Sequence, residues 1–198
     1  MPEAAVQRAR GTLFHTAVTD PRGDELLPLT VLAGRYPDLY ARHVAKYVGR
    51  EHRLRERVIP LDCAWADVVF FSPVDSALLF DAVRSAGRRA WAGPMWTLDA
   101  SRLDPRRCCV RLMRVTRGAR SADPGDEDDY LPLTTATLRA VSQVTDRALT
   151  RLRTLGPDEP LLPWGDVPHI LHRGPVPLDL FHKWHAKEQP ATGTSPAS

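Results

Sequence analysis

The sequence predicts an α+β fold, a single domain over residues 11–185 in which small mixed or antiparallel sheets are flanked by helices. Two observations support this prediction. The chain has 198 residues, 43% of them hydrophobic and 26% charged, as in ordinary globular domains. Strand-like and helix-like patterns follow one another without the strict βαβ alternation of a parallel sheet. Residues 186–198, which are mostly small or polar, are expected to form a disordered tail.

The first part of the chain contains two predicted strands and one helix. Residues 12–18 alternate well enough to form a strand, in which His15 points away from the apolar face. Residues 36–48 place tyrosine and valine at helical spacing, and Gly49 suits the helix end. Residues 67–71, with the sequence DVVFF, have the pattern of a short buried strand.

The middle of the chain continues with a helix and two strands. Ser72 is expected to cap a helix that begins at Pro73 and ends at Gly87. Residues 95–99 and 108–115 are further strand candidates, joined by a turn.

The last third is predicted to contain one long helix and a pair of strands. The helix should start near Thr134 and end before the turn at residues 155–160, since its leucines and valines recur at helical spacing. The acidic run 123–129 reads as a solvated loop. Residues 166–181 contain two strand-like runs separated at Gly174.

Composition limits the possible environment. No apolar run is long enough to cross a bilayer, and the first residues lack the apolar stretch of a secretory signal, so we expect no membrane association. The three cysteines have no zinc-site spacing, which predicts no metal and a reducing cytoplasm. All but three of the 27 basic residues are arginines, which is typical either of phosphate contact or of a biased genome.

No strong catalytic motif is present, and three weaker features remain. They are His15 in the first strand, the arginines at positions 50–57, and the C-terminal stretch 168–177. Each has a purely structural interpretation: a half-buried histidine, a solvated loop and a closing hairpin. None of them alone identifies a site.

Taken in order, these features resemble motifs of the ADP-ribosyltransferase superfamily, most closely its DarT-like nucleic-acid ADP-ribosyltransferases. The matching positions are residues 14–16 (Phe-His-Thr), an arginine at Arg57 or Arg55, and residues 67–79. The resemblance loosely covers residues 12–85. It implies an ADP-ribosyltransferase-like fold, NAD as the substrate, no metal, and transfer of ADP-ribose to a nucleic acid or protein acceptor.

The resemblance also implies roles for individual residues. His15 would bond a ribose hydroxyl of NAD, and Arg57 would approach the pyrophosphate or the reacting ribose. Either Phe70 or Phe71 would stack on the nicotinamide, because a strand directs successive side chains to opposite faces. The positions assigned to NAD are His15, Thr16, Arg55, Phe70, Phe71 and Ser72.

The catalytic carboxylate departs from the family pattern. The family places a glutamate on a late strand, where this chain has His169, with Asp166 three residues earlier. Three alternatives follow: Asp166 or another acid substitutes, the protein binds NAD without transfer, or the likeness is one of fold alone. The candidate catalytic set is therefore Arg57, Asp166 and His169.

Two functions of other classes stay open. One is a non-catalytic module that binds nucleic acid or an acidic protein through its arginines. The other is an assembly protein whose tryptophans anchor an interface.

Overall fold

The computed structural model describes residues 7–90, 93–116 and 123–184, and these form an α+β fold with small antiparallel sheets. The predicted tail at 186–198 lies outside the described residues. The predicted strands at the start of the chain, at 67–71, at 95–99 and near 108 are all confirmed.

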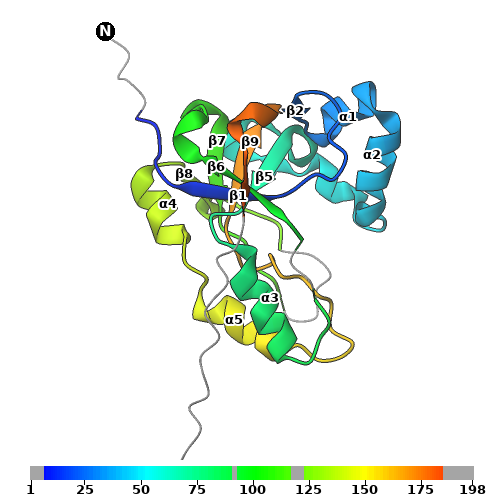
Figure 1. The fold of residues 1–198 in the computed structure, drawn as a ribbon, viewed down its shortest axis with the longest axis vertical. Coiled ribbons are helices and arrows are strands. Elements are labelled where there is room, and N and C mark those ends of the chain that lie inside the picture. The colour runs from blue at the N-terminus through cyan, green and yellow to red at the C-terminus, as the bar shows by residue number, and fades with distance from the viewer. Residues whose placement is uncertain (1–6, 91–92, 117–122, 185–198) are drawn as a thin grey trace, which may run out of the picture.

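Two antiparallel sheets form the centre of the molecule (Figure 1). The first has the order β1-β6-β11, from Thr12–Thr16, Met95–Asp99 and His182–Trp184. The second has the order β5-β9-β7-β8, from Val68–Phe71, His169–Arg173, Cys108–Arg111 and Tyr130–Pro132. Two-stranded ladders join β2 (Glu25–Leu26) to β10 (Val176–Pro177) and β3 (Arg57–Val58) to β4 (Cys63–Ala64).

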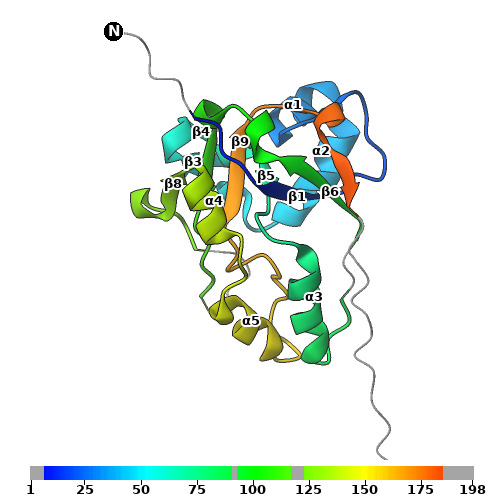
Figure 2. The same cartoon turned by 60° about the vertical axis from the view of Figure 1, so that its left-hand side comes forward.

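The helices lie in two groups. Helices α1 (Leu29–Arg35) and α2 (Pro37–Val44) lie together at one side of the sheets, and a 3₁₀ turn at Ala45–Tyr47 follows α2. Helices α3 (Ser76–Ser85) and α5 (Asp146–Arg153) lie side by side on the far side of the sheets from α1 (Figures 1 and 2). Helix α4 (Thr135–Val141) precedes α5.

Alternation along the second sheet separates two hydrophobic clusters. Phe71 and Ile170 point to the face that also holds Leu13 of β1. Phe70 and Leu171 point to the opposite face, where Trp65 and the 3₁₀ turns of residues 51–67 cover them. The basic segment 50–57 therefore lies over the face that carries Phe70.

The helix predicted at 73–87 is present as α3, but its start and cap differ, and the long helix predicted from Thr134 is divided. Helix α3 begins at Ser76 with Asp75 as its N-cap, which accepts a hydrogen bond from the backbone N–H of Ala77. The hydroxyl of Ser72 instead accepts from the backbone N–H of Val74, so that Ser72 stabilises a turn before the helix.

The second correction concerns the long helix, which is two helices. Helix α4 ends at Val141, and Thr145 caps α5 by accepting from the backbone N–H of Ala148. Hydroxyl side chains that bond local backbone favour helix ends over helix interiors. The run Ser142 to Thr145 thus interrupts a stripe of apolar residues that is otherwise continuous.

Candidate functional site

The candidate site opens where β1 and β5 separate. Phe14 and Ser72 exchange two backbone hydrogen bonds of 2.8 Å each. Continued antiparallel pairing would join Thr16 to Phe70, yet among the described residues no β-bridge forms there. The strands diverge after one bridge, and β5 is left as the edge strand of its sheet.

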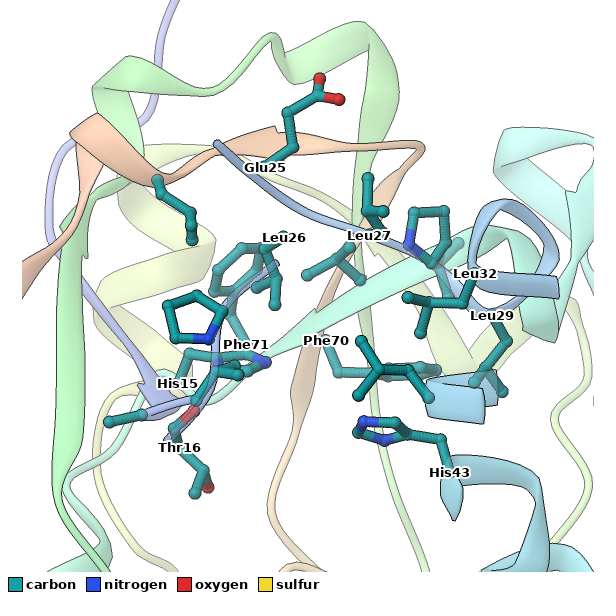
Figure 3. A pocket seen from close by; sticks show the side chains of 18 of the residues that line it. His15, Thr16, Glu25, Leu26, Leu27, Leu29, Leu32, His43, Phe70 and Phe71 are labelled. Carbon is teal, nitrogen blue, oxygen red and sulfur yellow. The ribbon is translucent and has the colours of Figure 1, made fainter. Parts of the chain in front are cut away.

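A cavity of about 690 Å³ occupies this opening (Figure 3). Its walls come from the end of β1, the connection at residues 17–28, helices α1 and α2, and β5. This volume is within the range of small-molecule and cofactor sites, roughly 300–1,000 Å³. The site is therefore a junction of segments that lie far apart in the sequence.

The cavity has an apolar, aromatic lining. Phe70 and Phe71 both line it, together with leucines from residues 26–39. The ring of Phe70 lies 6.3 Å from that of His169 and 4.7 Å from that of Trp65, measured between centroids. Phe71 is almost wholly buried, and its ring centroid lies 5.9 Å from that of His15. Phe70 is the more exposed ring and the better platform for an aromatic ligand.

His15 and His169 line the cavity as neutral acceptors. The Nδ1 of His15 lies 2.6 Å from the backbone oxygen of Thr16, and that of His169 lies 2.8 Å from the backbone oxygen of Val167. A carbonyl oxygen only accepts, so Nδ1 carries the proton and Nε2 keeps its lone pair. Burial lowers the pKa of each histidine to about 4, and both are uncharged at neutral pH.

One side of the cavity is basic. Arg42, His43 and Lys46 line it from α2 and the following turn, and Arg22 lines it from the connection after β1. The carboxylate of Asp38 lies 2.7 Å from Arg22 and 3.9 Å from Arg42.

The acids of the cavity wall are Asp20 and Glu25. Glu25 forms an ion pair of 2.9 Å with Arg35, and Asp20 lies 4.0 Å from Arg22. These carboxylates come from the connection between β1 and α1, far in sequence from the stretch that the family pattern indicates.

The structure brings together part of the predicted site. The predicted residues that line the cavity are His15, Thr16, Phe70, Phe71, Ser72 and His169. Arg55, Arg57 and Asp166 are absent from its described lining. Arg57 is exposed and forms an ion pair of 2.6 Å with Asp62.

Asp166 has a structural environment. It is buried, accepts a hydrogen bond of 3.1 Å from the backbone N–H of Val115, and pairs with Arg151 at 2.5 Å. Arg147 lies 3.8 Å from the same carboxylate. These contacts fix α5 against the segments that follow β7 and precede β9, and Asp166 is absent from the described cavity lining.

The basic segment also contributes a buried cluster, the Arg53–Arg111 cluster, which we define as Arg53, Glu56, Trp65, Arg111 and Tyr130. Glu56 lies 2.6 Å from Arg53 and 3.6 Å from Arg111. Both guanidinium groups lie over the ring of Trp65, at 5.4 and 5.9 Å, and Arg111 also lies 5.3 Å from the ring of Tyr130. This cluster holds the basic segment on the sheet.

Sequence reasoning missed the basic side of the cavity. Arg42, His43 and Lys46 lie in the predicted helix 36–48, where Arg42 and Lys46 share a face away from the tyrosines and His43 lies on the tyrosine face. Their spacing was a readable signal, because residues four apart share one helix face. Helical spacing does not show, however, that the face carrying Arg42 and Lys46 packs beside β1 and β5.

Comparisons of the chain with protein-family models, with curated proteins and with solved structures found no match. Within the part of the chain that the structure describes, no cluster of three or more histidine, cysteine or acidic side chains could hold a metal ion. Across residues 7–90, 93–116 and 123–184, no helix combines the length and apolar character needed to span a membrane.

Proposed function

We propose that the protein binds NAD in the cavity between β1 and β5 and acts as an ADP-ribosyltransferase on a nucleic acid or protein acceptor. The observation that carries the proposal is the convergence of His15, Phe70 and His169 from three separate strands on one cavity of cofactor size. Buried histidines with lowered pKa values in the wall of an open cavity are more typical of a functional site than of core packing.

The lining residues fit the parts of a dinucleotide. Phe70 offers an aromatic face on which the nicotinamide ring stacks. The Nε2 of His15 accepts a hydrogen bond from a ribose hydroxyl, and the exposed Thr16 can supply a further polar contact. Ser72 fixes the strand junction through its backbone bonds to Phe14.

The transfer breaks the bond between the nicotinamide nitrogen and ribose C1′, and nicotinamide leaves with the bonding electrons. The acceptor atom then bonds to C1′ and loses its proton. Positive charge develops on the ribose in the transition state, and a nearby carboxylate stabilises it. Asp20 and Glu25 line the cavity and Asp166 does not, so we assign this role to Glu25 or Asp20. His169, with its low pKa, serves as a hydrogen-bond acceptor.

Charge pairing argues against a module that works through its arginine surface. At least ten described arginines lie within 4.0 Å of a carboxylate, which neutralises much of the basic side: Arg22, Arg35, Arg42, Arg53, Arg57, Arg84, Arg111, Arg114, Arg147 and Arg151. Sequence-independent nucleic-acid binding depends instead on cations that are available to phosphates.

Calorimetric titration with NAD and thermal unfolding in millimolar NAD test the proposal. Wild-type protein should bind and unfold at a higher temperature, because a ligand of the native state stabilises it. His15→Ala and Phe70→Ala should each weaken binding about tenfold, the loss of one hydrogen bond or one stacked ring. His52→Ala changes an exposed histidine outside the cavity and should bind NAD like the wild type.

Release of nicotinamide in the presence of candidate acceptors tests the transfer. Glu25→Gln and Asp20→Asn should retain NAD binding, and the one that carries the catalytic carboxylate should lose turnover. A folded protein that is not stabilised by millimolar NAD contradicts the proposal. Steeply salt-dependent nucleic-acid binding in that same protein would support a binding module instead.

A further inference from the structure

The basic side of the cavity is a single surface. Arg42 and Lys46 are four residues apart and so lie on one face of α2 and its continuation, with His43 adjacent. Arg22 lines the same cavity from a different segment and reaches the α2 carboxylate of Asp38. In Figure 3, His43 extends from the α2 side of the cavity, while His15 and Thr16 lie on the β1 side. We name Arg22, Arg42, His43 and Lys46 the α2 wall.

The charge on the α2 wall is incompletely balanced. Asp38 is shared between Arg22 and Arg42, and among the described residues no carboxylate contributes to the pKa of Lys46. Burial lowers the pKa of Lys46, and burial followed by the charges of Lys46 and Arg42 lowers the pKa of His43. The same wall contributes to the low pKa of His15, after the larger effect of burial.

Arg42 and Lys46 thus place positive charge beside His43 and disfavour its protonated form. An anionic group beside Arg42 and Lys46 would offset this positive charge and would accept several charge-assisted hydrogen bonds. A guanidinium fork and an ammonium group together suit phosphate oxygens, which can accept bonds from both. The carboxylate of Asp38 pairs with Arg22 at 2.7 Å and lies 3.9 Å from Arg42.

We propose that the α2 wall, with Arg42 and Lys46 at its centre, is the subsite that binds a phosphate or pyrophosphate group in this cavity. The identification of that group as the pyrophosphate of NAD rests on the proposed function; the selection of a phosphate-type anion rests on the wall alone. This assignment replaces Arg57, which the resemblance gave to the pyrophosphate or the reacting ribose, and Arg55, which it gave to NAD binding; both are absent from the described cavity lining.

The rest of the lining agrees with this division of the cavity. Phe70, Phe71 and the leucines of residues 26–39 give an apolar region beside the basic wall. A ligand with one strongly anionic part and one or two aromatic rings would match both regions. A simple inorganic anion would match the wall and leave the aromatic region unused.

The test compares one double variant with a control of equal charge. Arg42→Gln/Lys46→Gln removes two cations from the wall with little change in side-chain length. Arg102→Gln/Arg153→Gln removes two cations from exposed positions outside the cavity. The ligands are inorganic pyrophosphate, NAD, and nicotinamide riboside, which has no phosphate. Binding is measured by calorimetry at two salt concentrations, and circular dichroism establishes that each variant is folded.

Wild type and control should bind pyrophosphate and NAD alike, more weakly as salt rises. The wall variant should bind both about tenfold or more weakly, with a smaller salt dependence, while nicotinamide riboside binds it as it binds the wild type. Equal binding of NAD and pyrophosphate to the wall variant and the wild type overturns the subsite.

The outcomes separate this inference from the proposed function. Pyrophosphate binding that depends on Arg42 and Lys46, without any binding of NAD, supports the subsite and contradicts the proposed function. NAD binding that is independent of the wall supports the proposed function and contradicts the subsite. If neither ligand binds the folded wild type, both are overturned.

Discussion

The protein uses basic side chains in two contrasting surroundings, the Arg53–Arg111 cluster and the α2 wall. In the cluster, Arg53 and Arg111 are 5% and 1% exposed, and Glu56 and aromatic rings enclose them. The Nη2 of Arg111 donates to the backbone oxygen of Asp123 at 2.9 Å. In the wall, Arg42, His43 and Lys46 face an open cavity and lack comparable partners among the described residues.

This contrast indicates that an arginine can lie close to the aromatic strand β5 and still have only a structural role. The cluster is closed: Gly125 packs so tightly on the guanidinium of Arg111 that an added Cβ would overlap it. Within the described residues, Nε and Nη1 of Arg111 are buried without hydrogen-bond partners, a cost that the fold tolerates. The cluster therefore serves the fold, and the wall is available to a ligand.

The largest expected effect tests the structural role of the cluster. Glu56→Gln keeps the side-chain shape and removes the negative charge between Arg53 and Arg111. Two buried guanidiniums would then lack a counter-charge, so the free energy of unfolding should fall by about 3 kcal/mol. Urea unfolding measures the loss, and the NAD affinity of the folded variant should stay within about twofold of the wild type.

Glu51→Gln is the matched control for that substitution, because Glu51 is exposed and accepts a hydrogen bond from the backbone N–H of Gly49. It should unfold like the wild type. If Glu56→Gln keeps its stability but no longer binds NAD, then the Arg53–Arg111 cluster is not purely structural, and the distinction between it and the α2 wall fails.

A smaller effect concerns the uncharged histidines of the cavity. Burial holds the pKa of His15 and His169 at about 4 in the folded protein, against 6.5 for an exposed histidine. Below pH 6.5 these histidines bind protons in the unfolded chain but remain neutral in the folded protein. Their contribution to the free energy of unfolding is therefore fully present above pH 6.5 and is lost as the pH falls towards 4. At pH 5, each of the two histidines should lower the free energy of unfolding by about 2 kcal/mol relative to pH 7.5.

Urea unfolding at the two pH values measures this difference. His15→Gln, which cannot be protonated, should lose less stability on acidification than the wild type, and His52→Gln, at an exposed position, should lose as much. A wild type that is equally stable at pH 5 and 7.5 would mean that these histidines are not held neutral, and their role as acceptors would fail with that result.

The sequence predicted the longer elements and missed the shortest ones for a physical reason. Alternation identified β1, a buried apolar run identified β5, and helical spacing indicated α2 and α3, whereas the two- and three-residue strands β2, β3, β4, β8 and β11 carry too short a pattern. Helix α1 was missed because Thr30, Val31 and Gly34 have low helix propensity, and its packing against α2 compensates for that weakness. Such packing depends on residues outside α1, so the sequence of α1 alone does not indicate a helix.

The same distinction applies to the site. Strand patterns placed His15 and Phe70 on β1 and β5, two segments that meet in the structure, whereas Ser72 was expected to cap a helix and instead pairs with Phe14. The direction of Arg57 depends on the turn from β3 to β4, in which Asp62 adopts a positive φ of 46°. That turn brings the carboxylate of Asp62 to the guanidinium of Arg57, an arrangement that spacing alone does not specify.

The smallest expected effect belongs to Arg57→Ala. The side chains of Arg57 and Asp62 are 70% and 81% exposed, so their ion pair should contribute less than about 0.5 kcal/mol to stability. Arg57 is also absent from the described cavity lining, and the NAD affinity should therefore be unchanged in the variant. Calorimetry and urea unfolding provide both values.

A variant that binds NAD normally but loses nicotinamide release would instead require the β3–β4 turn to move over the cavity during the reaction, because a side chain acts on the reacting ribose only by contacting it. Arg57 would then join the cations of the α2 wall as a functional residue, and the separation of structural from ligand-binding arginines would hold only for the resting protein.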